Sequence, residues 1–204
     1  MNRRDVLAAA VAVGVPALPM PSAWAQATTV EVSGVKFDTN IQLGGGTLKL
    51  NGYGVRHRFL FEVYAAGLYL STAASTVDAV LAAPGAKRVM MVMLRKLDAN
   101  DFGKILTTGI EKNASREEFV KSLPAIVRMG EATAAYKQLV PGDTMNIDWL
   151  PESGVTLYVK GKPLMEPVKE PGLFAAMMKI WLGRSPADAS LKEALLGGNR
   201  PAGL

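Results

Sequence analysis

The stretch from Val55 to Val63 constrains the fold most, because its side chains alternate with a period of two. The apolar set occupies the odd positions, namely Val55, His57, Phe59, Phe61 and Val63. This alternation predicts a β-strand with one apolar face, on which His57 would be a core residue. After Tyr64 the apolar set changes to Ala66, Leu68 and Leu70, so we expect a bulge or a bend between two strands at Gly67.

The rest of the chain predicts strands, two central helices, a meander of strands and two final helices. Strands are expected at residues 28–37, 47–50, 89–94, 144–150, 155–160 and 163–168, with a glycine hairpin turn at 44–46. Helices are expected at residues 76–83, 98–112, 115–139, 172–182 and 185–198. Ser115 and Glu118 form a capping box, and Pro124 should kink or split the third helix. This order predicts one α+β domain, residues 26–204, with a layer of helices on one face of a large antiparallel sheet.

The first 25 residues have the pattern of a cleavable export signal. Arg3 and Arg4 precede an apolar run, and Ala23-Trp24-Ala25 has the small side chains of a cleavage site. The run is too short for a bilayer span, which needs about 20 helical residues. The paired arginines are typical of a twin-arginine signal, although a general secretion signal also fits them. We expect a mature chain that starts at Gln26, without a transmembrane span, in a periplasmic or secreted protein.

Composition excludes several kinds of site. The chain has no cysteine, so it forms neither disulfides nor thiolate metal sites, and its single histidine excludes histidine-rich metal clusters. We expect neither a metal nor a cofactor. The net charge is +5, and the charged residues are interspersed along the chain. We interpret Lys87-Arg88 and Arg95-Lys96 as the solvated ends of a strand. Nucleic-acid binding needs a basic face with aromatic platforms, so we expect none.

Two motifs resemble the chalcone isomerase superfamily. The first is Gly52-Tyr53-Gly54-Val55-Arg56 followed by Ala65-Ala66-Gly67-Leu68-Tyr69-Leu70. The second is Trp181-Leu182-Gly183 followed by Ser185-Pro186 and by residues 191–197 at the C-terminal end. The chain is most similar to the exported bacterial branch called chalcone isomerase-like. The resemblance implies an open-faced sandwich, in which a large antiparallel sheet carries helices on one face.

The plant enzymes of this superfamily close chalcones to flavanones without a cofactor, and the resemblance does not favour that activity here. Arg56 matches the family's strand arginine, but the ketone-polarising threonine falls on Tyr64. Residues 101–108 lack the family's tyrosine and asparagine and keep only a nearby lysine, Lys104. The substrate-contacting hydroxyl falls near Ile180, which has no donor. With most hydrogen-bond donors missing, we expect no appreciable closure of chalcones.

A second branch, the plastid fatty-acid-binding proteins, resembles this chain better at the site. There an arginine and a tyrosine hold a carboxylate, and Arg56 and Tyr64 match them. On one extended strand these residues would lie about 26 Å apart, so both reach one carboxylate only if the chain turns between them. The ligand-binding residues implied are Arg56, Tyr64 and Lys104.

Three functional classes remain open. They are a non-catalytic binder of a small apolar acid such as a fatty acid, an isomerase acting on an unidentified enone, and an envelope protein that binds only protein partners. Each candidate residue also has a structural interpretation. Arg56 could pair with Glu62 or with an acidic residue on a neighbouring strand. A group of apolar side chains, Met90, Met91, Met93, Met177, Met178 and Trp181, is interpreted as core, with a ligand tunnel as the alternative.

Overall fold

A computed structural model describes residues 28–170, 172–199 and 201, without the side chains of Asn100 and Phe102. The expected signal peptide, residues 1–25, lies outside the described residues. No helix in the described part is both long and apolar enough to cross a membrane.

The centre of the fold is a curved seven-stranded sheet with the strand order β11-β10-β9-β6-β5-β4-β3. Every neighbouring pair is antiparallel. The strands are β3 (Asn40–Leu43), β4 (Gly46–Arg58), β5 (Phe61–Leu70), β6 (Lys87–Met93), β9 (Thr144–Leu150), β10 (Gly154–Val159) and β11 (Lys162–Pro163). A two-stranded ribbon, β7 (Leu97–Asp98) with β8 (Gln138–Leu139), lies beside it.

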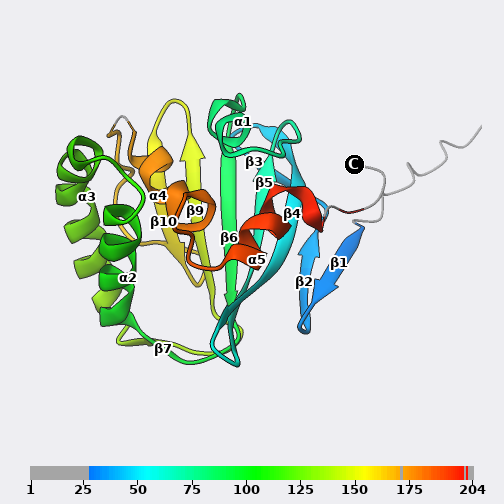
Figure 1. The fold of residues 1–204 in the computed structure, drawn as a ribbon, viewed down its shortest axis with the longest axis horizontal. Helices are drawn as coiled ribbons and strands as arrows, with labels where there is room; N and C mark the ends of the chain where they lie inside the picture. Colours follow the sequence, from blue (N-terminus) through cyan, green and yellow to red (C-terminus); the bar gives the residue numbers. More distant parts are fainter. Residues whose placement is uncertain (1–27, 171, 200, 202–204) are drawn as a thin grey trace, which may run out of the picture.

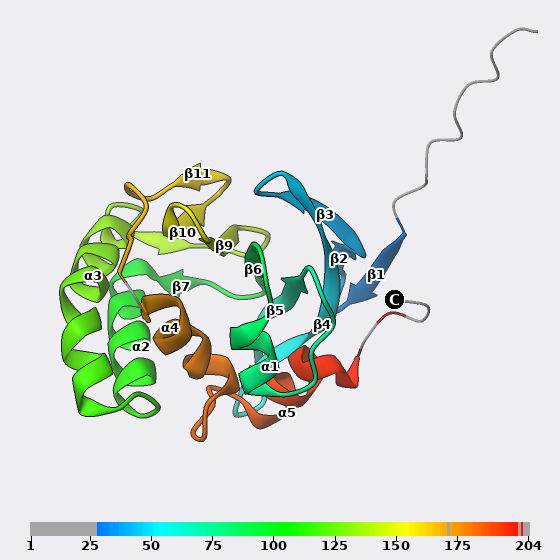
Figure 2. The same cartoon turned by 90° about the horizontal axis from the view of Figure 1, so that it is seen from above.

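Helices cover one face of this sheet, as the sequence predicts (Figures 1 and 2). They are α1 (Val77–Ala82), α2 (Ala99–Glu111), α3 (Arg116–Ala134), α4 (Leu173–Leu182), α5 (Ala189–Glu193) and the π-helical turn η1 (Ala194–Gly198). α4 is almost wholly buried between the sheet and the other helices. The main hydrophobic core fills the space between the helices and the even-numbered side chains of β5, among them Ala66, Leu68 and Leu70.

The opposite face of the sheet carries a hairpin that the sequence analysis missed. Residues 28–37 were expected to form one strand, but they form β1 (Thr29–Val32) and β2 (Val35–Asp38), which pair with each other. The chain reverses at Ser33 and Gly34, both with positive φ. Phe37 of this hairpin is fully buried in a second, smaller core with Leu50, Val55 and Tyr69. The sheet is therefore covered on both faces over its β4–β6 part.

The bend predicted at Gly67 is wrong. β4 continues to Arg58, a two-residue turn of Phe59 and Leu60 follows, and β5 begins at Phe61. Gly67 pairs regularly with Tyr53 on one side and Met90 on the other. The expectation of a core histidine is also wrong, because His57 is exposed near this turn. The alternation continues through the turn because apolar residues occupy exposed positions there, and periodicity alone cannot reveal that.

Two further boundaries differ from the expectation. α3 begins with the predicted capping box of Ser115 and Glu118, but it is one helix that includes Pro124 and ends at Ala134. Pro124 is exposed, so the backbone carbonyl that loses its partner can be solvated. The strand expected at residues 163–168 shortens to β11 and a single bridge between Val155 and Val168.

The basic pair Lys87-Arg88 is not a solvated strand end. Lys87 is buried, with its ammonium 5.7 Å from the centre of the Phe174 ring. Burial lowers the pKa of the Lys87 amine. On the other face of β6, Arg88 donates two hydrogen bonds of 2.6 Å to the two carboxylate oxygens of Asp148. Sequence reasoning missed both because the segments that bury these residues, helix α4 and strand β9, are far away in the chain.

Candidate functional site

Arg56 and Tyr64 lie directly opposite each other on neighbouring strands. The turn at Phe59 and Leu60 reverses the chain between them, so they are cross-strand partners of β4 and β5. The guanidinium carbon of Arg56 is 5.6 Å from the centre of the Tyr64 ring. The turn therefore removes the 26 Å separation that one extended strand would impose, and both side chains can meet one small group.

The two glycines that precede Arg56 bring the C-terminal segment to the same face. A Cβ on Gly54 would lie 2.8 Å from the Cβ of Ala194, and one on Gly52 would lie 2.8 Å from the carbonyl oxygen of Leu195. Asn51 holds the approach by donating to the Leu195 carbonyl at 2.8 Å. Because Gly52 and Gly54 have no side chains, α5 and η1 pack directly against the backbone of β4. Arg56 lies at the edge of this contact.

Arg56 and Tyr64 line a small internal cavity between the sheet and the helices. Its other walls come from β6, β7, β9, α2 and α4, namely Met91, Met93, Leu97, Ile105, Leu106, Met145, Ile180 and Trp181. The cavity has a volume of about 20 Å³, room for about one water molecule. Apart from Arg56, Tyr64 and the indole of Trp181, its walls are apolar.

The polar groups at this cavity are incompletely paired. The Nε of Arg56 is buried and has no hydrogen-bond partner. No ion pair joins Arg56 to an acidic side chain in the described ranges, so the expected alternative of a pair with Glu62 is not formed. A buried donor without a partner costs about 1–3 kcal/mol. Arg56 therefore lines the cavity with a donor that no protein group satisfies, and an acceptor placed in the cavity can pair with it.

Tyr64 keeps its own hydroxyl proton free to donate. Its oxygen accepts a hydrogen bond of 2.7 Å from Nε1 of Trp181. Burial raises the pKa of the Tyr64 phenol, and the nearby Arg56 cation and the Trp181 hydrogen bond offset this only in part. The phenol is therefore neutral at physiological pH and can donate to an acceptor inside the cavity.

Asp188 supplies the acidic charge nearest to this pair, but its oxygens are already engaged. One accepts from the backbone N–H of His57 at 2.7 Å, and the other caps α5 through the N–H of Leu191 at 3.0 Å. The His57 ring lies between Asp188 and Glu62, at 3.9 and 3.8 Å. Asp188 thus ties the start of α5 to β4 without forming an ion pair with Arg56.

The structure brings together two of the three site residues expected from the sequence. Lys104 is exposed on α2, pairs with Asp101 at 3.3 Å and does not line the cavity. Met177 and Met178 are core residues, as expected, and Met91, Met93 and Trp181 are core residues that also line the cavity. The sequence predicts Trp181 as a core residue, with a ligand tunnel as the alternative, and does not indicate its bond to Tyr64. A buried indole N–H usually needs an acceptor, and that rule points toward a polar partner such as Tyr64.

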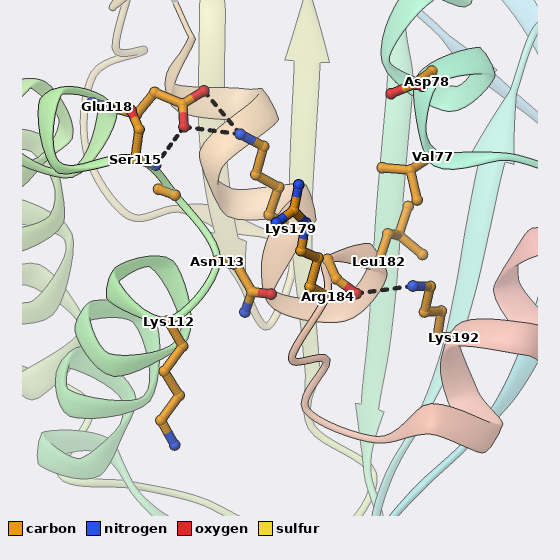
Figure 3. A pocket seen from close by; sticks show the side chains of 12 residues that line it. Val77, Asp78, Lys112, Asn113, Ser115, Glu118, Lys179, Leu182, Arg184 and Lys192 are labelled. Carbon is orange, nitrogen blue, oxygen red and sulfur yellow. Dashed lines mark hydrogen bonds and ion pairs between the residues drawn. The ribbon is translucent and has the colours of Figure 1, made fainter.

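A larger groove, of about 620 Å³, opens where α2 ends, α3 begins and α4 ends (Figure 3). Four basic side chains line it, namely Lys112, Lys179, Arg184 and Lys192. The hydrogen bonds drawn in Figure 3 connect the ends of neighbouring helices. Lys179 donates to both oxygens of Glu118, at 2.8 and 2.9 Å, and Lys192 donates to the carbonyl of Gly183 at 2.9 Å. These bonds stabilise the junction of α3, α4 and α5, so we interpret this groove as structural.

Comparison with known proteins agrees with this geometry. A family model for chalcone isomerase-like proteins matches residues 29–197. The chain belongs to the chalcone isomerase-like family. A search of curated proteins found no match.

Among solved structures, the Arabidopsis thaliana fatty-acid binding protein AtFAP1 has the same fold as this chalcone isomerase-like chain. The TM-score is 0.64 at 16% sequence identity, and the match covers 84% of this chain and 97% of that one. At this identity the likeness concerns the fold alone. The predicted open-faced sandwich of a large antiparallel sheet and helices is confirmed.

Proposed function

We propose that this chalcone isomerase-like protein is a non-catalytic binder of a small apolar carboxylic acid, such as a fatty acid. The observation that carries the proposal is the buried Nε of Arg56, which has no protein partner, beside the Tyr64 hydroxyl, which accepts from Trp181 and keeps its own proton to donate, at an apolar cavity. A structural neighbour that binds fatty acids, AtFAP1, adds support at the level of the fold.

The proposed site matches the chemistry of a carboxylate. A carboxylate that leaves water needs a charged or hydrogen-bonding partner, because its desolvation otherwise exceeds the gain from burying the alkyl chain. A guanidinium can donate two parallel hydrogen bonds to one carboxylate, and the Tyr64 hydroxyl adds a third donor. The alkyl chain would contribute about 0.8 kcal/mol for each buried methylene group.

The ligand must enlarge the cavity, because 20 Å³ is far below the several hundred Å³ of ordinary ligand sites. Three of the walls are methionines, Met91, Met93 and Met145. Their unbranched side chains can repack around a ligand at small cost. We therefore expect affinity to rise with chain length and then to level off once the methionines can move no further.

Replacing Arg56 by Met should weaken binding of a fatty acid by about tenfold to a hundredfold, because charge-assisted hydrogen bonds contribute roughly 1.5–3 kcal/mol. Tyr64→Phe should cost less, roughly 0.5–1.5 kcal/mol. Calorimetric titration of a series of saturated acids against the wild type and both variants measures these losses. The Arg56→Met variant should also be more stable in urea, since it removes an unpaired buried donor.

The control variant is Lys104→Met, which removes an exposed cation of α2 that does not line the cavity. It should bind the acid like the wild type. The methyl ester of the same acid should bind at least tenfold more weakly than the acid itself. Equal affinity for acid and ester, or full affinity in Arg56→Met, would show that the arginine is structural.

We also propose that the protein acts outside the cytoplasm, as a member of an exported bacterial branch of the family. The support is the pattern of residues 1–25, with paired arginines, a short apolar run and the Ala23-Trp24-Ala25 site. Mass analysis of the protein from the periplasm or medium should give an N-terminus at Gln26. A protein that retains Arg3 and Arg4 in the cytoplasm would contradict export.

A further inference from the structure

The turn between β4 and β5 exposes three consecutive large apolar side chains. Phe59 is 89% exposed, Leu60 is 95% exposed and Phe61 is 55% exposed. The turn lies at the lower edge of the molecule in Figure 1, where β6 also ends. Single exposed apolar residues are common on protein surfaces, but a run of three at a hairpin tip is unusual unless it has a function.

The backbone of this turn shows that the apolar residues are retained at a cost. Phe59 has a φ of +55°, in the left-handed region. It is the first residue of a two-residue hairpin turn, where turns with one positive φ usually have glycine. An aromatic side chain is disfavoured in this conformation. The position would be less strained with glycine or asparagine, so stability does not explain the phenylalanine.

Basic residues surround the tip. Arg58 precedes it, and Arg95 and Lys96 follow the end of β6; all three are exposed. The guanidinium carbon of Arg95 lies 4.0 Å from the centre of the Phe61 ring, over its face. Glu62, next to Phe61, carries the opposite charge and accepts a hydrogen bond of 2.8 Å from Ser33, so it offsets one of these three cations. The tip therefore combines an apolar end with a cationic collar.

We propose that this tip, residues 58–61 with Arg95 and Lys96, docks on the surface of a bilayer that contains anionic lipid. Apolar side chains at the end would enter the boundary between headgroups and acyl chains, and the collar would contact lipid phosphates. A protein partner fits less well. The three side chains offer about 500 Å², less than the roughly 800 Å² that each partner contributes to a standard interface.

Membrane docking is a function beyond ligand binding, and the tip lies close to the proposed ligand site. The tip begins two residues beyond Arg56 along β4, which is about 7 Å on a strand. A molecule docked through the tip would hold Arg56 and Tyr64 just above the membrane surface.

The absence of cysteine allows a site-specific test on the full chain. Leu60→Cys is labelled with a polarity-sensitive fluorophore and mixed with acid-free vesicles of phosphatidylcholine, with or without phosphatidylglycerol. The matched control is Val127→Cys, which puts the same fluorophore on an exposed apolar residue of α3, 48% exposed. The label at residue 60 should shift to the blue with anionic vesicles and be quenched by brominated lipid, and the label at 127 should not.

Two further variants test the contributions of the apolar and the basic residues separately. Each variant also carries one of the two fluorophore labels, at a residue that the variant itself does not change. Phe59→Asn, with the label at residue 60, should lower the vesicle partition coefficient at least about tenfold. It should fold at least as well as the wild type, since asparagine tolerates a positive φ. Arg95→Gln with Lys96→Gln should remove most of the preference for anionic vesicles, as should high salt.

Other outcomes would overturn the proposal. Equal blue shifts at residues 60 and 127 would mean that contact is not made through the tip. No shift at residue 60 with any vesicle would exclude membrane docking, whatever the calorimetry of fatty acids shows. A sedimentation equilibrium that shows a dimer, lost in Leu60→Ser, would assign the tip to contact with a second copy instead.

Discussion

Replacing Arg88 by Met should destabilise the protein by about 3–5 kcal/mol, because it leaves a buried carboxylate without its charged partner. The Asp148 side chain is only 1% exposed, and both of its oxygens accept from Arg88 at 2.6 Å. In water that carboxylate would be solvated, whereas here the guanidinium is the group that compensates its burial. Urea denaturation followed by circular dichroism measures the loss.

The double variant Arg88→Met with Asp148→Leu distinguishes the pair from simple packing. Removing both charges leaves no unpaired group, so most of the lost stability should return. A matched control is Lys121→Met, which breaks the solvent-exposed pair of Lys121 with Glu117 on α3 and should have no measurable effect. A double variant as unstable as Arg88→Met would mean that the shapes of the side chains matter and their charges do not.

Replacing Gly52 by Ala should be the most damaging methyl addition on β4, at about 3 kcal/mol. The new Cβ would overlap the Ala194 carbonyl oxygen and lie 2.8 Å from that of Leu195. Both are backbone atoms, which cannot rotate away, so the segment of α5 and η1 must leave the sheet. The control is Gly46→Ala on the same strand, where the nearest atom, the carbonyl oxygen of Leu43, would be 3.9 Å from the new Cβ.

The consequence of Gly52→Ala should extend to the site. Asp188 caps the start of α5, and its carboxylate also accepts a hydrogen bond from the N–H of His57, next to Arg56. If the C-terminal segment moves, that contact opens, and the position of Arg56 is no longer defined. Thermal unfolding gives the stability, and titration with a fatty acid gives the affinity. If Gly52→Ala keeps the stability and the affinity of Gly46→Ala, the close contact between Gly52 and the C-terminal segment is contradicted.

Elements that depend on local pattern were predictable. The strand at Thr144–Leu150 is observed with the expected bounds. The capping box of Ser115 and Glu118 starts α3, since each of its hydrogen bonds joins residues three apart. The apolar positions of α4 follow a helical period and are buried. In each case the residues that decide the structure are near neighbours in the chain.

Errors occurred where a distant segment decides. The chain turns at Phe59 and not at Gly67, because alternation does not distinguish an exposed apolar residue from a buried one. Lys87 and Arg88 looked like a solvated pair, yet one is covered by Phe174 of α4 and the other is paired with Asp148 of β9. Lys104, which family resemblance places at the site, pairs with Asp101 and is not among the residues that line the cavity.

The sequence by itself determined the alternation of β4 and β5, the helix caps, the family motifs and the candidate pair of Arg56 and Tyr64. Only the tertiary structure decided that this pair faces one cavity and that Arg56 lacks a partner. It also decided that Trp181 completes the site and that the apolar turn is exposed. The physical reason is distance along the chain. The bond from Trp181 to Tyr64 joins residues 117 positions apart, and that from Asn51 to Leu195 joins residues 144 apart.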